Sequence, residues 1–402
     1  MKNGKKMPLE EVCNVEYGTR VVQKRDGGSV YPVYGGGGAT FKMDEFNRED
    51  RLVIARFGMS EECTRFVAGK FFLNDSGLTV SPKNGAMLQR FLDYQMLSLN
   101  DDIYALGKGT AQKNLDVPVF RALTLYTPND AKEQQRIVGI LDESFEGIAS
   151  AKTNAEKNLQ NARALFESHL QSVFTQLGKG WVEKSVGELV AEGTLVKPFD
   201  GNHGDIHPRK ADYTESGVPF VMACDLQHGS VDTEYCTFIS RKLADSLRVG
   251  FAKDGDVLIS HKGTIGRSAI VSTDDDYIML TPQVTSYRVR DGSKLFNRYV
   301  RYYFMSPVFQ REMIAAAADG STRAYIGITK QLSLRFRFPA LAEQKRISAE
   351  LDVLDPETQR LATLYERKVA ALDALKKSLL HQAFTGQLQE LYERSRNQSR
   401  AH

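Results

Sequence analysis

The stretch Glu133-Gln134-Gln135-Arg136-Ile137, followed by Leu141-Asp142, occurs a second time as Glu343-Gln344-Lys345-Arg346-Ile347, followed by Leu351-Asp352. The shift of 210 residues (343 minus 133) continues without a gap as far as Phe174-Thr175, which matches Phe384-Thr385. An ungapped match of this length is not expected by chance, so the chain contains an internal repeat.

The repeat also extends toward the N-terminus. With a shift of 211 residues (320 minus 109), Gly109-Thr110-Ala111-Gln112 matches Gly320-Ser321-Thr322-Arg323. Earlier in the chain, residues 52–58 are similar to residues 257–263. The chain therefore consists of two copies of one unit, each a globular part followed by a helical part.

The helical parts are predicted to be long. From Ile137 onward, apolar residues recur at steps of three and four, which places them on one face of a helix. No proline interrupts residues 130–178, and a helix of that length spans roughly 70 Å. In the second copy Pro356 interrupts the pattern, so we expect a kink or break there, with Asp355 as the cap of a new helix.

A long apolar stripe needs a partner surface. We expect the two helices to pack on each other as an antiparallel coiled coil. The alternative is that each helix covers its own globular part or mediates dimerisation. The globular parts are predicted to be mixed α and β, because short β-branched and aromatic runs alternate with helical stretches. The predicted strands are residues 51–57, 218–222, 256–260, 269–272 and 283–289, and the predicted helices are residues 88–98 and 296–317.

The predicted fold class is therefore α+β, with two globular mixed α/β domains separated by two long antiparallel coiled-coil helices and an internal pseudo-two-fold repeat. The predicted segments are a first domain (1–129), a central helix (130–178), a second domain (179–340), a C-terminal helix with a kink near Pro356 (341–392) and a polar tail (393–402).

Bulk composition narrows the class of protein only slightly. A net charge of +3 is too small to indicate nucleic-acid binding unless Lys and Arg cluster locally. Four cysteines without a C-x-x-C pair do not form a disulfide framework, which fits a reducing cytoplasm. No apolar run is long enough for a membrane span, and the first residues lack an apolar signal core. We therefore expect a cytoplasmic protein.

The pattern EQxRIxxxLD at the start of a long helix, preceded by a strand that ends in proline, resembles the repeat of type I restriction-modification specificity subunits. Four further pieces resemble this family: Tyr31-Pro32-Val33-Tyr34-Gly35-Gly36, Asp256-Val257-Leu258-Ile259-Ser260 with Lys262-Gly263-Thr264-Ile265-Gly266, Gly320-Ser321-Thr322-Arg323, and Phe384-Thr385-Gly386-Gln387-Leu388. Each motif is weak alone, but their order is specific, and the resemblance covers roughly residues 7–390.

The resemblance implies two target-recognition domains, each of which recognises one half of a split sequence in double-stranded DNA. The long helices then fix the gap between the halves and bind two methyltransferase subunits, which methylate adenine at N6 with S-adenosylmethionine. Motor-nuclease subunits, which use ATP and magnesium, complete the restriction complex. No cofactor is expected on this chain itself.

The sequence offers no catalytic motif of its own. It contains no Pro-Pro pair of an adenine methyltransferase motif, and the glycine run at residues 35–38 lacks the Gly-Lys-Ser/Thr ending of a phosphate-binding loop. His203 and His207 have a metal-ligand spacing, but the following Gly204 and Pro208 indicate a loop. We expect neither a metal site nor an active site.

Candidate DNA contacts are polar and basic residues in glycine-rich loops, because phosphates and base edges are bound by such side chains. In the second domain they are His261, Lys262, Thr264, Arg267, Ser321, Thr322, Arg323 and Tyr325, with Arg209 and Lys210 as weaker candidates. In the first domain the repeat indicates Arg56, Ser60, Lys108, Thr110, Gln112 and Lys113, and Tyr34 is added for its place beside the glycine run.

Two other classes of function are considered. A coiled-coil scaffold would bind protein and no DNA, and it would not show the steep salt dependence of phosphate contacts. A nuclease would cleave plasmid in the presence of magnesium. For a DNA-recognition protein, Arg323→Ala is predicted to weaken specific binding by about 1–3 kcal/mol.

Overall fold

The computed structural model describes residues 4–385 and residue 387, except residues 84, 86, 129, 177, 179 and 318–324. The chain packs as two compact units. The first unit holds Met1–Glu156 and Glu366–His402, and the second holds Lys157–Tyr365. The division falls within two long helices, α6 (Ala131–Thr175) and α12 (Leu341–Thr385), so each unit contains one α/β part and a length of both helices.

The α/β part of the first unit is built around a six-stranded sheet with the order β2-β7-β5-β6-β3-β4. β5 pairs antiparallel with β6 and β7, and β3 pairs parallel with β6. The elements are β1 (Gly4–Pro8), α1 (Leu9–Val12), β2 (Cys13–Tyr17), α2 (Gln23–Asp26), β3 (Tyr31–Tyr34), β4 (Lys42–Met43), β5 (Arg48–Ala55), β6 (Thr64–Leu73), β7 (Gly77–Pro82), α3 (Gln89–Ser98), α4 (Asn100–Ala105), β8 (Gly107–Lys108), β9 (Asn114–Leu115), α5 (Val117–Arg121) and β10 (Thr124–Pro128).

The α/β part of the second unit contains two five-stranded sheets, β12-β16-β13-β20-β17 and β14-β15-β19-β18-β21. Its strands are β11 (Val182–Ser185), β12 (Tyr213–Thr214), β13 (Val218–Val221), β14 (Leu226–Gln227), β15 (Gly229–Val231), β16 (Thr237–Ile239), β17 (Phe251–Ala252), β18 (Val257–Ser260), β19 (Ser268–Ile270), β20 (Ile278–Leu280), β21 (Val284–Tyr287) and β22 (Arg335–Phe338). Its helices are α7 (Val186–Ala191), α8 (Arg241–Ser246), α9 (Asn297–Met305), α10 (Pro307–Ala317) and α11 (Ile328–Gln331), with short 3-10 turns at Gly204–Ile206, Lys210–Asp212 and Ala223–Asp225.

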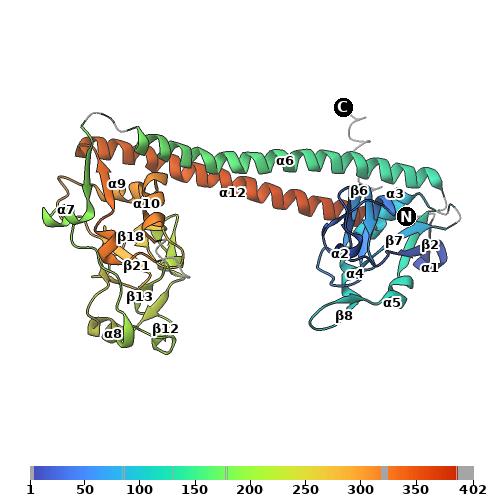
Figure 1. Cartoon of the computed structure of the whole chain (residues 1–402), viewed down its shortest axis with the longest axis horizontal. Coiled ribbons are helices and arrows are strands. Elements are labelled where there is room, and N and C mark those ends of the chain that lie inside the picture. The colour runs from blue at the N-terminus through green and yellow to red at the C-terminus, as the bar shows by residue number, and fades with distance from the viewer. Residues whose placement is uncertain are drawn as a thin grey trace. The chain divides into compact units, whose positions relative to one another are not determined.

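The two units repeat the same plan around their helices. In the first unit β1 pairs antiparallel with β10, and in the second β11 pairs antiparallel with β22, so the strand before each long helix is held by the first strand of the α/β part that precedes it. Within each unit a length of α6 (green in Figure 1) runs beside a length of α12 (red). The α+β fold class, the coiled-coil helices and the internal repeat expected from the sequence are confirmed.

The core of each unit contains residues from both long helices. In the first unit Ile137 and Leu141 of α6 pack with Leu380 and Ala383 of α12 around the buried side of α3 and its sheet. In the second unit the roles are exchanged: Ile347 and Leu351 of α12 pack with residues from the end of α6, which are Phe166, Leu170 and Phe174. Burial of these apolar side chains stabilises each helix end on its α/β part.

All five predicted strands and the first predicted helix are confirmed. β5, β13, β18, β19 and β21 lie where β-branched and aromatic residues cluster, and α3 covers the stretch predicted at residues 88–98. The helical stretch predicted at residues 296–317 is helical, but it is divided into α9 and α10 at Ser306. Pro307 disfavours helical backbone at Ser306, whose ψ is 141°, and the Ser306 hydroxyl then accepts a hydrogen bond from the Phe309 N–H.

Of the kink or break expected at Pro356, the break does not occur, because α12 continues through this residue. The side chain of Asp355 does not cap a new helix; it forms a buried ion pair with Arg301, with a nitrogen–oxygen distance of 2.7 Å. Leu351 and Leu354, five and two residues before the proline, pack against the core of the second unit. These tertiary contacts keep the helix continuous although proline lacks an N–H for its hydrogen-bond ladder.

Among the helices in the described part of the chain, none is long and apolar enough to cross a membrane.

Candidate nucleic-acid interface

Two of the segments predicted to contact DNA meet in the first unit. The loop after β5 contains Arg56, and its carbonyl accepts a hydrogen bond from the Leu115 N–H at 2.8 Å. Phe57 forms an isolated antiparallel bridge with Asn114, whose side chain accepts a hydrogen bond from the Gly58 N–H. We call residues 56–60 and 108–114 the first loop pair, because main-chain bonds hold them together.

The corresponding segments of the second unit are joined in the same way. The carbonyl of His261 accepts a hydrogen bond from the Ile326 N–H at 3.1 Å, and Lys262 forms an isolated antiparallel bridge with Tyr325. The sequence repeat matches Phe57 with Lys262 and Asn114 with Tyr325. We call residues 261–267 together with Tyr325 the second loop pair. The repeat thus preserves the main-chain pairing of the two loops, while the side chains on these loops differ.

Basic side chains of the first loop pair lie on aromatic rings. The guanidinium carbon of Arg56 is 5.0 Å from the centre of the Tyr17 ring and 4.5 Å from that of Phe57, and Lys113 Nζ is 3.9 Å from the centre of the Tyr104 ring. Such contacts hold a cation without neutralising it. Lys108 instead pairs with Asp116, and this ion pair lowers the pKa of the Asp116 carboxyl.

The glycine run after Tyr34 lies beside the first loop pair. A Cβ on Gly36 would come within 2.3 Å of the Phe57 carbonyl oxygen, so only glycine allows this close approach. The Tyr34 ring packs edge-on against Phe71, with centroids 5.6 Å apart. Tyr34 is therefore part of the core next to the loop pair and exposes only part of its surface.

In the second loop pair, Lys262, Thr264 and Arg267 are exposed. Gly263 and Gly266 have φ of +78° and +92°, values that favour glycine and let the loop turn sharply between these side chains. The loop therefore presents two cations and a hydroxyl on a short, tightly turned segment.

His261 was predicted to contact DNA, and this prediction is wrong for the side chain. The ring is fully buried and its Nδ1 lies 2.7 Å from the Thr285 hydroxyl, while its Nε2 lies 3.6 Å from Asp200 Oδ2. Burial lowers the pKa of His261 to about 4. The ring therefore supports the loop from beneath and is not available to a ligand.

The remaining predicted contacts are accounted for as follows. Exposed side chains are those of Ser60, Lys108, Thr110, Gln112, Arg209, Lys210 and Tyr325, and half-buried ones are those of Arg56 and Lys113. Arg209 and Lys210 begin a 3-10 turn and are not part of either loop pair. Ser321, Thr322 and Arg323 lie outside the described residues.

A polar pocket of about 380 Å³ lies beside Lys262. The sequence does not predict that the other lining residues meet here, because they come from separate loops: His203, Gly204, His207, Tyr213, Met222, Thr281, Pro282 and Gln283. Donors and acceptors of this kind suit base edges or phosphate oxygens.

The two pocket histidines are engaged within the protein. His203 Nε2 lies 3.0 Å from Asp200 Oδ2, and the His207 ring packs against Phe220. Burial lowers the pKa of His207. The loop predicted between them contains a short 3-10 turn.

Comparison with known proteins shows which proteins this chain resembles. Residues 1–160 match the family model described as the type I restriction modification DNA specificity domain. The resemblance to type I specificity subunits that the sequence motifs indicate is confirmed.

Particular relatives extend the match. The chain is 22% identical over 187 residues to the type I restriction enzyme EcoBI specificity subunit of Escherichia coli, which covers 46% of this chain and only 38% of that protein. It is 23% identical over 369 residues to a Haemophilus influenzae protein provisionally named as a type I restriction enzyme specificity subunit, with 88% of each chain covered.

Two solved structures share the fold. A chain from a study of complex assembly and conformational transition of the type I restriction-modification system has a TM-score of 0.69 at 17% identity, covering 96% of this chain and 99% of that one. The HsdS subunit from Thermoanaerobacter tengcongensis has a TM-score of 0.52 at 18% identity, covering 96% and 98%.

Proposed function

We propose that this chain is the DNA-recognition subunit of a type I restriction-modification complex, and that each unit recognises one half of a split DNA target. The observation that carries the proposal is that the two loop pairs are held together by matching main-chain hydrogen bonds. Arg56 and Leu115 in the first unit, and His261 and Ile326 in the second, make the same main-chain hydrogen bond. A scaffold duplicated with different exposed side chains is suited to recognise two different half-sites.

Within this proposal the loop pairs face the DNA. Arg56 and Lys113 of the first unit, and Lys262 and Arg267 of the second, supply cations for phosphates or guanine edges. Exposed Thr110, Gln112 and Thr264 add uncharged donors and acceptors. The different side chains of the two loop pairs predict two different half-site sequences.

The chain is proposed to have no catalytic role of its own. Methyltransferase subunits with S-adenosylmethionine would methylate adenine at N6, and motor-nuclease subunits with ATP and magnesium would complete the complex. In the second unit the helices carry an apolar groove of about 550 Å³ lined by Leu165, His169, Glu350, Val353, Leu354 and Glu357. An exposed apolar groove of this kind supports the docking of a partner protein on the helices.

A methylation map tests the proposal. The chain is co-expressed with the methyltransferase subunit encoded beside it, in a host without adenine methylation, and the DNA is sequenced for N6-methyladenine. We expect one motif made of two short halves around a gap of fixed length. Absence of methylation from a complex in which the two proteins copurify would contradict the proposal.

A further inference from the structure

The EQxRIxxxLD motif occurs at the start of both long helices, and the structure gives each of its residues a contact. Glu133 pairs with Arg136 within α6, as Glu343 pairs with Arg346 within α12. The isoleucine and leucine of each copy are buried in the core of their unit. The glutamine and the aspartate remain, and both bind the helix of the α/β part that lies next to the long helix.

In the first unit the glutamine and aspartate hold α3. Gln134 Oε1 accepts a hydrogen bond from the Leu88 N–H at 2.7 Å. Asp142 accepts hydrogen bonds from Arg90 at 3.0 Å and from the Tyr94 hydroxyl, and Arg90 also donates to the Tyr94 oxygen. We call these five residues the first joint.

The second unit repeats this arrangement on α9. Gln344 Oε1 accepts a hydrogen bond from the Phe296 N–H at 3.0 Å, and Asp352 accepts from Arg298 at 2.5 Å and from the Tyr302 hydroxyl at 2.8 Å. We call these five residues the second joint. Arg90 and Arg298 are the second residues of α3 and α9, and Tyr94 and Tyr302 are the sixth, so the match extends to helix register.

Positions next to the joints carry side chains of different chemistry in the two units. The fifth residue is Asp93 in α3 and Arg301 in α9, and the long-helix position three residues after the motif aspartate is Phe145 in one copy and Asp355 in the other. The buried Arg301–Asp355 ion pair therefore has no equivalent in the first unit. The joints are the same in both units although the side chains around them differ, which points to a shared task.

Each joint attaches the α/β part to the long helix at two points, and two points fix its orientation whereas one would allow rotation. The glutamine and the aspartate of each joint are eight residues apart, which is about 12 Å along a helix. Adding one base pair between two DNA half-sites moves one of them by about 3.4 Å and turns it by about 35°. A recognition domain must therefore be held on its helix to within a few ångströms if only one gap length is to be accepted.

We infer that the two joints are positioning devices that restrict the DNA gap to a single length, by fixing each recognition domain on the long helix that follows it. The inference rests on the proposed function and deepens it. Gln134, Asp142, Gln344 and Asp352 are then positioning residues that touch no DNA, and they affect the gap without affecting which bases are recognised.

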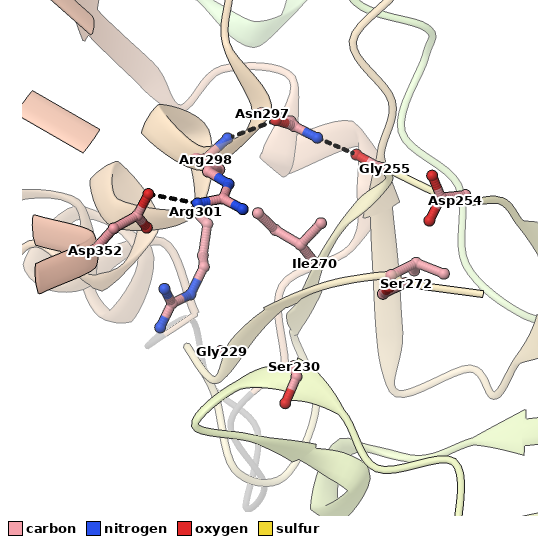
Figure 2. Close-up of a pocket in the computed structure, with 11 residues that line it drawn as sticks. Gly229, Ser230, Asp254, Gly255, Ile270, Ser272, Asn297, Arg298, Arg301 and Asp352 are labelled. Atoms are coloured by element: carbon pink, nitrogen blue, oxygen red, sulfur yellow. Dashed lines mark hydrogen bonds and ion pairs between the residues drawn. The ribbon is translucent and has the colours of Figure 1, made fainter. Parts of the chain in front are cut away.

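The joints can be altered without removing a buried charge. Figure 2 shows Arg298 and Asp352 facing each other at the wall of a pocket of about 400 Å³, while Arg301 points toward Gly229. The side chains of Arg298 and Asp352 are 56% and 30% exposed, and those of Arg90 and Asp142 are 42% and 45% exposed. Ion pairs this exposed contribute little to stability, so their loss should leave the fold intact.

The test uses methylation maps of the complete complex with Asp142→Asn, Asp352→Asn and the double variant. Tyr94→Phe and Tyr302→Phe each remove a single hydroxyl group that binds the joint aspartate. They replace the Asn variants in the same experiment if an Asn variant does not fold. Arg346→Gln is the matched control, because Arg346 pairs with Glu343 and Glu350 of its own helix and is not part of either joint.

The expected result is that joint variants methylate the same two half-site sequences with additional gap lengths, one base pair longer or shorter. The wild type and Arg346→Gln should keep one gap length. Folded joint variants that keep a single gap, or that change a half-site sequence, would overturn the inference. Absence of a two-part motif in the wild type would instead overturn the proposed function.

Discussion

Lys262 is exposed in the second loop pair and lies directly before Gly263, whose φ is +78°. Lys262→Ala should weaken binding of the methyltransferase complex to its target. If Lys262 contacts a phosphate, the slope of log K against log salt should become shallower by about one. If it contacts a base, the loss should be about 1–3 kcal/mol and confined to one half-site.

Fluorescence anisotropy with duplexes altered in one half-site at a time measures both effects. Lys242→Ala is the matched control, because Lys242 is an exposed lysine of α8 outside the loop pair. Equal affinities and equal salt slopes for wild type and Lys262→Ala would remove Lys262 from the interface.

His261 makes a prediction about pH. Its pKa is about 4 in the folded protein against an ordinary value of 6.5, mainly because it is buried, and Asp200, His203 and Lys262 are the charged or titratable groups around it. Between these two values the unfolded chain binds a proton that the folded chain does not. The free energy of unfolding should therefore fall as pH falls from about 6.5 to 4, by roughly 3 kcal/mol.

His261→Gln should remove this part of the pH dependence. Trp181, the single tryptophan, packs on Tyr299 in the second unit, so its fluorescence reports unfolding of that unit. At pH 7.5 both forms of residue 261 are neutral, and the difference there gives the packing cost of the substitution. Parallel stability curves for the two proteins from pH 7.5 to 4 would rule out this role.

At this scale the sequence predicts which segments correspond between the two units, but not that they meet. The repeat matches Arg56 with His261 and Asn114 with Tyr325, whereas the pairing of Lys262 with Tyr325 and of Arg56 with Leu115 is seen only in the structure. It could not predict that His261 is buried. The groups that surround the ring, Asp200 and Thr285, come from distant parts of the chain, and no local pattern records their approach.

At the scale of elements, Pro356 in the interior of α12 lowers the stability of this helix. Proline in a helix interior is about 3 kcal/mol less favourable than alanine. Pro356→Ala should therefore raise the free energy of unfolding of the second unit by about 1–3 kcal/mol, measured by urea denaturation with Trp181 fluorescence.

Pro307→Ala provides the comparison. Pro307 is the first residue of α10, where a helix does not need the missing N–H, so this substitution should give little or no stabilisation. A Pro356→Ala protein that is less stable than the wild type would show that the surrounding contacts require the proline.

The long helices and the longer strands could be predicted because each has a periodic pattern of its own. α6 shows a three-and-four spacing along its whole length, and β5 contains the run Leu52-Val53-Ile54. The sheet order of the second unit could not be predicted. β20 has only three residues and pairs in parallel with β13, an arrangement set by packing between segments distant in sequence.

At the scale of the whole molecule, the apolar groove on the helices should matter for assembly. Leu165 and Val353 are 53% and 67% exposed within it. Replacing both by serine should reduce copurification with the methyltransferase subunit, because apolar area would be lost from the contact. Tyr235→Ser is the control, since Tyr235 is 80% exposed in the α/β part of the second unit.

The outcome of that experiment shows whether the methyltransferase subunit docks in the groove or elsewhere on the chain. Loss of copurification by the double variant, with an unchanged melting temperature, supports docking on the helices. Full copurification of the Leu165→Ser, Val353→Ser protein would place the methyltransferase contact elsewhere on the chain.

The central claim is that each unit recognises its own half of the DNA target. The most direct test replaces residues 179–340 with the corresponding segment of another type I specificity subunit and maps N6-methyladenine in the resulting complex. The prediction is that one half of the motif changes to that of the donor protein, while the other half stays the same. A motif in which both halves change, or neither does, would contradict the assignment of one half-site to each unit.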